Sequence, residues 1–592
     1  MRWKLAAECR ADGNALAAAL GVAPPIGRLL AQRGVLEEDA ALRFLNPDVT
    51  DLHDPFLLCD MDKAVSRLSS AMDAGEVIAV FGDYDVDGIT SAALLGRVLG
   101  KLARKPGTIK TYVPHRHRDG YGLSPETIDH LHAEGAVVVV SADCGISGHA
   151  AAERATALGI DLIVTDHHEP QATLPDAYAI VNPKREGSRY PFRDLAGVGV
   201  AFKLAQALAS RRGVTLEKFW PRFLDLVALG TVADNAPLLD ENRAIVQLGL
   251  LRLSDTRKAG LRALLAAVGA LQRPIRAATI SFQVAPRLNA VGRVDDAALG
   301  LELMMTQDVT RAQELVAMLE RLNDQRREEQ ERIWQEASDA IRAQGLAQDK
   351  VIVVHGANWH KGVVGIVAGR LADVYHRPAL VVATDGDVAR GSARSASSFP
   401  MIDALGACRD FLTDYGGHSQ AAGFDMLVAN LPGLRAGLNR FADGYLEEDD
   451  IIPSLDVDLE IEPYEITLAA FRDLARLEPF GAGNREPLWM ARGFKVLSAT
   501  CFGRADDRAH LSLRVCGEGM GPTDCVWWRK AARIDQFTPN SRCDMVFRME
   551  QNHFGNGGLR LVIQDAVPGG TGGDSEFAGP AAETFSADGT TA

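Results

Sequence analysis

The 592-residue sequence contains no apolar run long enough to cross a membrane, and its first residues lack the apolar core of a signal peptide. It also contains no C-x-x-C pair, and its eight cysteines are scattered. This scatter excludes a cysteine-based zinc site and a disulfide framework. We therefore expect a protein of the reducing cytoplasm that has free thiols and no membrane partner.

Basic residues are in the minority, because 63 Lys and Arg stand against 78 Asp and Glu and give a net charge of -15. A negative chain repels nucleic acid, but a metal site itself needs acidic residues, and a local basic groove can coexist with an acidic exterior. Much of the acidic excess lies in two short runs, 447–450 and 456–460. The net charge therefore does not exclude a nucleic-acid partner.

One acidic stretch, Gly82-Asp83-Tyr84-Asp85-Val86-Asp87-Gly88, organises the rest of the chain. The apolar run 77–81 before it predicts a buried strand, and the run 91–99 after it predicts a helix. Alternate residues of an extended segment point the same way, so at least two of the three carboxylates can converge. Carboxylates that lie close together repel each other unless a cation lies between them. Taken alone, the stretch could also be a solvated acidic loop.

The same pattern recurs further along the chain. Two more predicted strands, 137–141 and 162–165, precede acidic or histidine-containing turns, and an apolar helical run ends at Asp234. Loops at the carboxyl ends of parallel strands gather at one edge of an α/β sheet. The residues expected to meet there are Asp83, Asp85, Asp87, Asp143, Asp166, His167, His168 and Asp234. Carboxylates with one or two imidazoles suit Mg²⁺ or Mn²⁺, and we favour a site for two ions over a site for one.

Basic residues gather in two other stretches. The first, 113–122, mixes cations, aromatic residues and turn glycines, which suits contact with a phosphodiester chain. The second, 285–293, contains Arg287 and Arg293, and its alternative interpretation is a surface loop.

The chain is too long for one hydrophobic core, and its length predicts about three to four domains. Residues 310–343 contain no Gly or Pro and predict a helix about 50 Å long. Its two apolar stripes flank a middle stretch, 326–332, that is polar all round. We interpret this helix as a rigid connector that holds two lobes apart and leaves a groove between them.

A second lobe begins with the predicted strand 350–355, and the glycines that follow can leave backbone N–H groups free for an anion. Ser392 and Arg394 suit a terminal phosphate, because a guanidinium makes bidentate, charge-assisted contacts. His418 lies in a glycine-rich loop, and a single histidine in such a loop more often has a structural role than a functional one. About six short strands over 455–563 predict an OB-like barrel, and 568–592 has the composition of a disordered tail.

These motifs together resemble the DHH phosphoesterase superfamily, whose name-giving triplet is similar to Asp166-His167-His168. The loop 416–423 resembles the DHHA1 domain of that superfamily, and the order of the motifs is similar to that of its single-stranded-DNA-specific exonucleases. The resemblance implies an α/β fold in which a DHH-type parallel-sheet domain is joined by a long helix to a DHHA1 α/β domain, followed by an OB-like β-barrel. The boundaries expected are 1–75 for an N-terminal helical segment, 76–308 for the DHH domain, 309–345 for the connector helix, 346–450 for the DHHA1 domain, 453–567 for the OB-like domain and 568–592 for the tail.

The resemblance also implies roles for individual residues. The metal ligands would be Asp83, Asp85, Asp87, Asp143, His167 and Asp234, with Asp166 and His168 as further catalytic residues. The residues that bind the substrate would be Arg116, Arg287, Arg293, His360, Ser392, Arg394 and His418; whether Arg287 or Arg293 holds the 5′ phosphate stays open. The cofactors would be two divalent cations, Mn²⁺ or Mg²⁺.

The activity implied is 5′-to-3′ degradation of single-stranded DNA to 5′ mononucleotides in DNA repair and recombination. The protein would be a cytoplasmic monomer that binds single-stranded DNA with a 5′ end and works beside a single-strand-binding protein and a RecQ-type helicase. One alternative is a DHH/DHHA1 phosphodiesterase for nanoRNA or cyclic dinucleotides, which the OB-like domain and the long helix disfavour. The other is a non-catalytic replication scaffold on the same fold, which the full set of acidic residues disfavours.

Overall fold

The computed structural model describes residues 1–7, 11–114, 122–294, 297–396, 399–503, 509–552 and 558–569. Contacts divide these residues into two units: one joins 1–5 to 323–457, and the other joins 6–322 to 458–569. Among the described residues, no helix combines the length and apolarity needed to span a bilayer. The stretch around Arg116 and the predicted tail from residue 570 onward lie outside the described residues.

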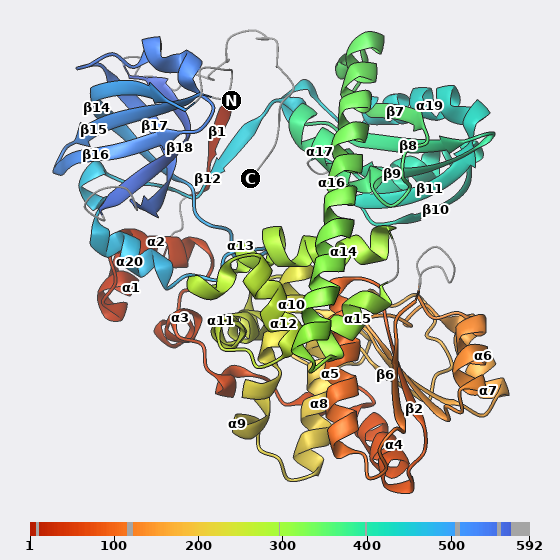
Figure 1. The fold of residues 1–592 in the computed structure, drawn as a ribbon. Coiled ribbons are helices and arrows are strands. Elements are labelled where there is room, and N and C mark those ends of the chain that lie inside the picture. Colours follow the sequence, from red (N-terminus) through yellow and green to blue (C-terminus); the bar gives the residue numbers. More distant parts are fainter. Residues whose placement is uncertain are drawn as a thin grey trace. The chain divides into compact units, whose positions relative to one another are not determined.

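The larger unit contains a five-stranded sheet in which every strand runs parallel to its neighbours (Figure 1). The strands in spatial order are β3 (Ile109–Tyr112), β2 (Ile78–Gly82), β4 (Val138–Ala142), β5 (Asp161–Thr165) and β6 (Ala179–Val181). The chain leaves β2 for β3 on one side and then crosses to β4 on the other. In such a sheet the loops after β2 and β4 diverge and open a crevice at the carboxyl edge.

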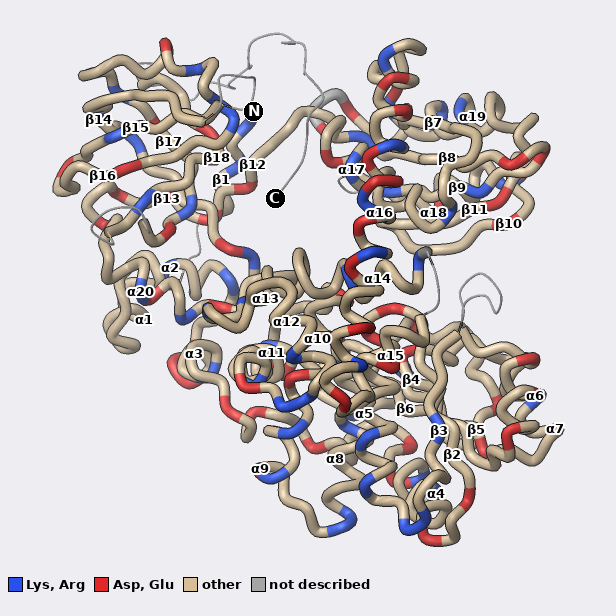
Figure 2. Tube along the Cα trace, in the orientation of Figure 1, with Lys and Arg blue, Asp and Glu red and all other residues tan. Residues whose placement is uncertain are grey.

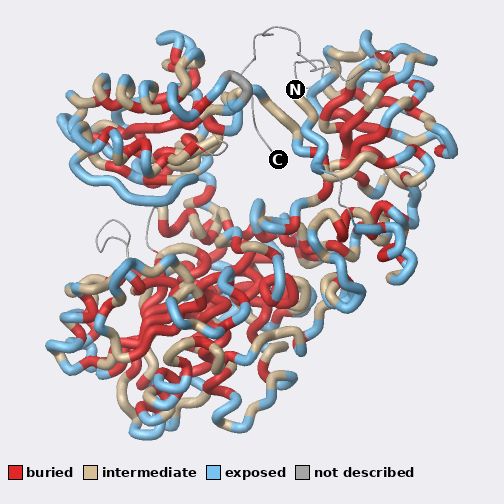
Figure 3. The backbone as a smooth tube through the Cα atoms, turned by 180° about the vertical axis from the view of Figure 1, so that it is seen from behind, coloured by how far each residue is buried: buried red, intermediate tan, exposed pale blue. Residues whose placement is uncertain are grey.

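Helices cover both faces of this sheet (Figure 1), and side chains that alternate along the strands pack against them. Ile78 and Val80 pack on one face and Ala79 and Phe81 on the other, as the period of two requires. The helices on the first face are α4 (Met61–Ala74), α5 (Val86–Leu102) and α8 (Gly197–Arg211), and α10 (Leu224–Ala233) packs on α5 and α8. Those on the second face are α6 (Pro125–Ala133) and α7 (His149–Ala157). Figure 3 shows the buried strands running between exposed helix surfaces.

Further helices extend the core around α5, namely α9 (Leu216–Phe219), α11 (Asp240–Ser254), α12 (Ala259–Ala267), α14 (Ala285–Val294) and α15 (Ala298–Met305). The stretch 285–293 therefore forms a helix and not the surface loop of the alternative interpretation. Its apolar residues Leu288 and Val291 are fully buried.

The helix α16 (Val309–Gln344) has 36 residues and a length of about 54 Å. Its first apolar stripe, which includes Leu315 and Leu319, joins the core of the larger unit. Its second stripe, which includes Ile333 and Ile341, joins a core of the smaller unit. Basic and acidic residues alternate along the helix (Figure 2), and Arg332 forms ion pairs with Glu329 and Glu336 at 2.6 and 2.8 Å.

The smaller unit contains a mixed sheet whose strands in spatial order are β10 (Leu412–Gly417), β11 (Ala421–Leu427), β9 (Val388–Arg394), β8 (Ala379–Asp385) and β7 (Ile352–Ala357). Only β7 and β8 are parallel neighbours in it. The second half of α16 and α17 (Val364–Tyr375) cover one face, and α18 (Met401–Ala407) and α19 (Leu431–Asp443) cover the other.

The carboxyl-terminal barrel belongs to the larger unit and closes through the pairing of its first long strand with its fourth. Its strands are β14 (Trp489–Phe502), β15 (His510–Gly517), β16 (Met520–Trp527), β17 (Arg542–Gln551) and β18 (Leu559–Pro568), and β13 (Leu459–Glu460) pairs in parallel with the start of β14. The predicted architecture of parallel sheet, long helix, mixed sheet and barrel is therefore confirmed.

The N-terminal segment has contacts that the sequence did not indicate. Its helices α1 (Gly13–Leu20) and α2 (Pro24–Gln32) bury Leu29 and Leu30 in the core of the barrel, beside α20 (Leu468–Ala475). The strand β1 (Arg2–Leu5) pairs in parallel with β12 (Ser454–Val457) in the smaller unit. The first of the strands predicted over 455–563 is thus two strands with different partners, because β12 pairs with β1 and β13 (Leu459–Glu460) pairs with β14.

Arg243 of α11 joins three distant segments of the larger unit. Its guanidinium is fully buried and donates hydrogen bonds to the carbonyl oxygens of Phe44 (2.7 Å), Arg476 (3.2 Å), Leu477 (2.9 Å) and Glu478 (3.0 Å). Burial lowers its pKa to about 9. We expect Arg243→Ala to lower the free energy of unfolding by about 3–5 kcal/mol, because one buried and three part-buried carbonyls lose their donor.

Urea denaturation followed by circular dichroism measures this effect. The matched control is Arg262→Ala, because Arg262 is exposed on α12 and its loss should change stability by less than about 0.5 kcal/mol. Equal midpoints for the two variants would contradict the role given to Arg243.

Candidate metal centre

The candidate metal ligands lie where the strand order of the parallel sheet reverses. Asp83 follows β2, Asp143 follows β4, and Asp166 follows β5. Asp85 is the N-cap of α5 and accepts a hydrogen bond from the Gly88 N–H at 3.0 Å, which fixes the turn between strand and helix. Asp143 has a φ of 65°, a left-handed conformation that aspartate tolerates better than most residues.

The structure brings seven of the eight predicted catalytic residues into three overlapping groups. Within each group the candidate ligand atoms lie within 4.8 Å of one another. The groups are Asp83, Asp85 and Asp143; Asp87, His167 and Asp234; and Asp143, His167 and His168. Because Asp143 and His167 each belong to two groups, the cluster is continuous and offers more ligand atoms than one ion needs.

Two buried atoms at the centre of the cluster lack a hydrogen-bond partner among the described residues. They are Asp143 Oδ1 and His167 Nε2, which lie 3.2 Å apart. Burial lowers the pKa of His167, so its imidazole is neutral and its Nε2 can present a lone pair to the carboxylate. Two facing acceptors repel each other unless a cation or a proton lies between them. The residues present therefore fit a divalent cation.

The proximity of the carboxylates in the cluster changes their pKa values. Burial, together with repulsion by neighbouring carboxylates, raises the pKa of Asp87 and of Asp234 to about 7. The same two causes raise the pKa of Asp143 well above its usual range. A bound divalent cation would take the place of protons on these groups.

Asp166 differs from the other carboxylates because it is already saturated with donors. It accepts hydrogen bonds from the backbone N–H groups of Ile146 (2.9 Å), His167 (2.7 Å) and His168 (3.0 Å) and from His168 Nδ1 (2.7 Å). Burial alone would lower the pKa of His168, but the hydrogen bond to Asp166 and the charge of that carboxylate raise it to about 9. Asp166 therefore orients a cationic His168 and belongs to none of the three groups.

Sequence reasoning missed the backbone groups that hold Asp87. At the start of α8 the N–H groups of Gly197 and Val198 donate to its two carboxylate oxygens at 2.7 and 2.8 Å. A Cβ at position 197 would lie 2.4 Å from Asp143 Oδ1, so only glycine fits there. The sequence signal that could have found this contact is the pair of glycines at 197 and 199, which opens a helix. This helix N-terminus holds a carboxylate of the protein itself.

The predicted substrate contacts lie in both units. On α14, Arg287 forms an ion pair with Glu320 at 2.6 Å and donates to the Gln283 carbonyl at 2.6 Å, and Arg293 lies half-buried near the end of the same helix. Both belong to the unit that contains the metal cluster. Arg116 lies outside the described residues.

The other four lie in the smaller unit. Arg394 and Ser392 approach the first turn of α17, since a Cβ at Gly365 would lie 3.0 Å from Arg394 Nη2 and 3.3 Å from Ser392 Oγ. Burial lowers the pKa of Arg394, which forms an ion pair with no carboxylate of the described chain. His418 is exposed at the turn between β10 and β11, and His360 Nδ1 accepts from the Gly362 N–H at 3.1 Å.

Family models match the chain in three places. The DHH family, N-terminal domain, matches residues 77–231; the DHHA1 domain matches 348–443; and the RecJ OB domain matches 457–565. The first match contains the sheet edge and nearly the whole metal cluster. The chain is therefore a DHH phosphoesterase that has a DHHA1 domain.

Whole-chain comparisons narrow this class further. The chain is 37% identical over 570 residues to the single-stranded-DNA-specific exonuclease RecJ of Bacillus subtilis, an alignment that covers 96% of this chain and 71% of that protein. Crystal structures of Thermus thermophilus RecJ in complex with Mn²⁺ and with Mg²⁺ match with TM-scores of 0.81 and 0.75, at 30% and 29% identity. Each covers 96% of this chain, and the matches span 80% and 79% of those chains. The chain belongs to the RecJ family, and the resemblance given above is confirmed.

The raised pKa values predict how pH affects the metal-free protein. Asp87 and Asp234 have a pKa of about 7 in the fold, against about 3.9 for an unfolded aspartate. Between these values the folded protein binds more protons than the unfolded chain, so its free energy of unfolding falls as the pH rises through 7. We expect a lower melting temperature at pH 8 than at pH 6 in EDTA, measured by calorimetry.

Addition of Mn²⁺ should remove most of this decrease, because the cation neutralises the ionised carboxylates. Asp234→Asn should give a shallower pH dependence than the wild type, since one of the titrating groups is gone. A metal-free melting temperature that rises between pH 6 and pH 8 would show that these carboxylates are ionised without a cation.

Proposed function

We propose that the protein is a metal-dependent exonuclease that degrades single-stranded DNA from its 5′ end to 5′ mononucleotides. The observation that supports this most directly is the pair of facing acceptors, Asp143 Oδ1 and His167 Nε2, 3.2 Å apart within a cluster of carboxylates. The substrate is supported by the relatives, which are named single-stranded-DNA-specific exonucleases.

Two divalent cations, Mn²⁺ or Mg²⁺, would be held by six residues: Asp83, Asp85 and Asp143 for one, and Asp87, His167 and Asp234 for the other. When bound, such ions supply Lewis acidity toward a phosphodiester and toward water. Gly197 and Val198 hold Asp87 in the orientation that its ligand role requires. Backbone donors thus keep the acidic residues in place before any cation binds.

His168 would contact the scissile phosphate. Its raised pKa makes it a cation at neutral pH, and a cationic imidazolium donates to phosphate oxygens and does not bind metal. Asp166 would act as a positioning residue, because it holds Nδ1 of His168 and leaves Nε2 for the substrate.

The 5′ phosphate would be bound by Arg394 and Ser392 at the first turn of α17, where Gly365 leaves space beside them. A guanidinium without a carboxylate partner, a hydroxyl and helix N–H groups together suit a dianionic terminal phosphate. Further contacts to the strand would come from Arg116, Arg287, Arg293, His360 and His418. A pocket for the terminal phosphate restricts cleavage to the 5′ end.

We also propose that the protein acts as a monomer in the cytoplasm, in DNA repair and recombination, beside a single-strand-binding protein and a RecQ-type helicase. The free thiols of the described residues support the compartment, because disulfides are rare in the reducing cytoplasm. The partners follow from the single-stranded substrate, which a helicase produces and a single-strand-binding protein covers.

Removal of a metal ligand tests the centre. We expect Asp85→Ala and His167→Ala each to reduce turnover of a 5′-phosphorylated strand at least about 1,000-fold, because a ligand of the reacting cations is lost. The controls are Asp255→Ala and His132→Ala, which remove exposed side chains of the same types and should keep wild-type turnover. Circular dichroism checks that all four variants fold; wild-type rates for the first two would exclude the proposed centre.

A separate prediction concerns recognition of the strand end. Arg394→Ala should raise the KM for 5′-phosphorylated strands about tenfold or more and should change the KM for 5′-hydroxyl strands little, since the lost contact is to the terminal phosphate.

Digestion of end-labelled single strands, duplexes and 3′-blocked strands with each metal measures the direction of degradation and the size of the products.

The expected products are 5′ mononucleotides, from 3′-blocked strands as well. Activity that falls as the strand lengthens and is highest on dinucleotides would point to a short-substrate phosphodiesterase. If Arg394→Ala raised the KM equally for 5′-phosphorylated and 5′-hydroxyl strands, Arg394 would not contact the terminal phosphate.

A further inference from the structure

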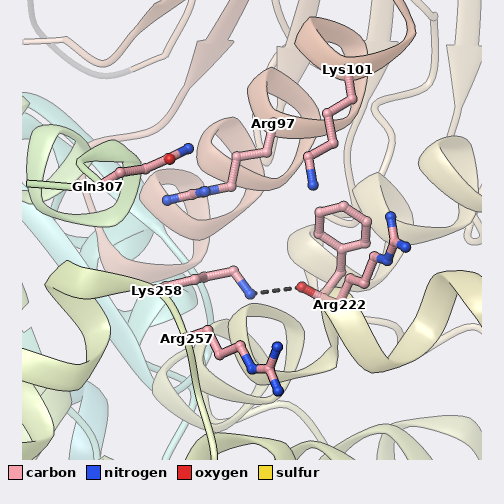
Figure 4. A pocket seen from close by; sticks show the side chains of 7 residues that line it. Arg97, Lys101, Arg222, Arg257, Lys258 and Gln307 are labelled. Carbon is pink, nitrogen blue, oxygen red and sulfur yellow. Dashed lines mark hydrogen bonds between the residues drawn. The ribbon is translucent and has the colours of Figure 1, made fainter.

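A second basic site lies in the larger unit, at the carboxyl end of α5. It is a cavity of about 300 Å³, and Figure 4 shows side chains from several segments pointing into it. Its lining consists of Arg97, Lys101, Arg222, Phe223, Arg257, Lys258 and Gln307. The lining contains five cationic side chains and no acidic one.

This cavity is separate from the metal centre. Asp87 lies in the first turn of α5 and Arg97 ten residues further along, which corresponds to about 15 Å of helix. The exonuclease function proposed above gives no role to any of the lining residues. The cavity therefore needs an explanation of its own.

The structure neutralises only one of the five cations. Lys258 Nζ contacts both carboxylate oxygens of Asp225 at 2.6 and 2.8 Å and donates to the Arg222 carbonyl at 2.7 Å. Within the described chain Arg97 donates to backbone carbonyls, Met304 O at 2.6 Å and Met305 O at 3.2 Å, which fix its guanidinium without removing its charge, and Asp225 attracts it without forming an ion pair.

No ion pair within the described chain involves Arg97, Lys101, Arg222 or Arg257. The cations also lie close enough to affect one another, because burial and the charges of Arg97 and Lys101 together lower the pKa of Lys258 despite Asp225. Like charges held around one small space favour an anion between them.

The size and charge of the cavity limit what the anion can be. A single phosphate carries about two negative charges, so two or three linked phosphates are needed to balance four cations. A volume of about 300 Å³ is at the small end of ligand pockets and accommodates such a chain. A DNA strand would instead need a long groove with several stacking platforms. Here there is one aromatic ring, Phe223, and Lys101 Nζ and Lys258 Nζ lie 5.9 and 5.8 Å from its centroid.

We propose that this cavity binds the polyphosphate group of a small ligand such as a nucleoside triphosphate. Lys101, Arg222 and Arg257 at the exposed rim make charge-assisted contacts to the phosphates, and Arg97 contacts them from the half-buried wall. The Gln307 side-chain amide is a further donor. Because Arg97 also holds the end of α15, a bound polyphosphate stabilises the packing of α15 on α5.

Isothermal titration of the full chain tests this proposal. The titration is done in EDTA, so that binding of the probe to divalent cations cannot imitate binding to the cavity. The probes are inorganic triphosphate, ATP and inorganic phosphate. We expect triphosphate and ATP to bind with 1:1 stoichiometry and phosphate to bind at least tenfold more weakly. A higher affinity for ATP than for triphosphate would mean that the nucleoside is also recognised, and equal affinities that the phosphates alone are.

Two triple variants separate the cavity from general charge. Lys101→Ala/Arg222→Ala/Arg257→Ala should weaken triphosphate binding at least tenfold, because three charge-assisted contacts are lost. Lys105→Ala/Lys218→Ala/Arg262→Ala removes the same charge from exposed positions outside the cavity and should keep wild-type affinity. All six side chains are exposed, so both variants should keep the wild-type melting temperature and, without ligand, the wild-type nuclease rate.

Three results would overturn the proposal. The wild type could fail to bind triphosphate at millimolar concentration, or both triple variants could lose affinity equally. The third concerns DNA: if only the cavity variant loses affinity for a single-stranded oligonucleotide, measured by fluorescence anisotropy, the cavity belongs to the path of the strand. A protein without nuclease activity that still binds triphosphate through these residues would refute the proposed function and leave this site intact.

Discussion

Repulsion between buried carboxylates is the constraint on which this structure depends. The parallel sheet ends its strands at one edge, and acidic residues after β2 and β4 are forced together there. The fold limits the cost with backbone donors, since Gly88 holds Asp85 and the start of α8 holds Asp87. Asp143 Oδ1 and His167 Nε2 have no such donor among the described residues, and in our proposal a cation lies between them. The fold as well as the chemistry therefore favours the proposed metal centre.

The metal cluster could be predicted from sequence because every member follows a local signal. Asp83, Asp143 and Asp166 each follow a short apolar strand, and one topological rule brings such positions together. The different roles of the individual acidic residues could not be predicted. Asp166 and Asp87 look alike in sequence, yet Asp166 is saturated by four donors and Asp87 is held by a helix that begins 110 residues later. Such differences depend on tertiary contacts that no local pattern contains.

The fold was predictable to a similar degree. The long helix, the mixed sheet and the barrel all have periodic or turn signals of their own. The two apolar stripes predicted on either side of the polar middle of α16 do pack into different cores. The role of the N-terminal segment was not predictable, because an amphipathic helix does not reveal its partner. Leu29 and Leu30 complete a core whose strands lie more than 450 residues away. The stretch 285–293 shows the same limit, since its helix is stabilised by contacts with the core.

This distant pairing affects how the protein is made. The Ala23 N–H bonds to Asp473, 450 residues later in the chain, so α2 leaves the ribosome long before its partner exists. At about 5–20 residues per second, translation needs roughly 20–90 seconds to cover that interval. Throughout this time α1 can cover part of α2, but the residues of α2 that pack on the barrel have no native surface to cover them, and the barrel is completed only when synthesis is almost finished. The contacts of these helices with the barrel must therefore be among the last native contacts to form, and a nascent-chain chaperone would meet that part of their surface exposed.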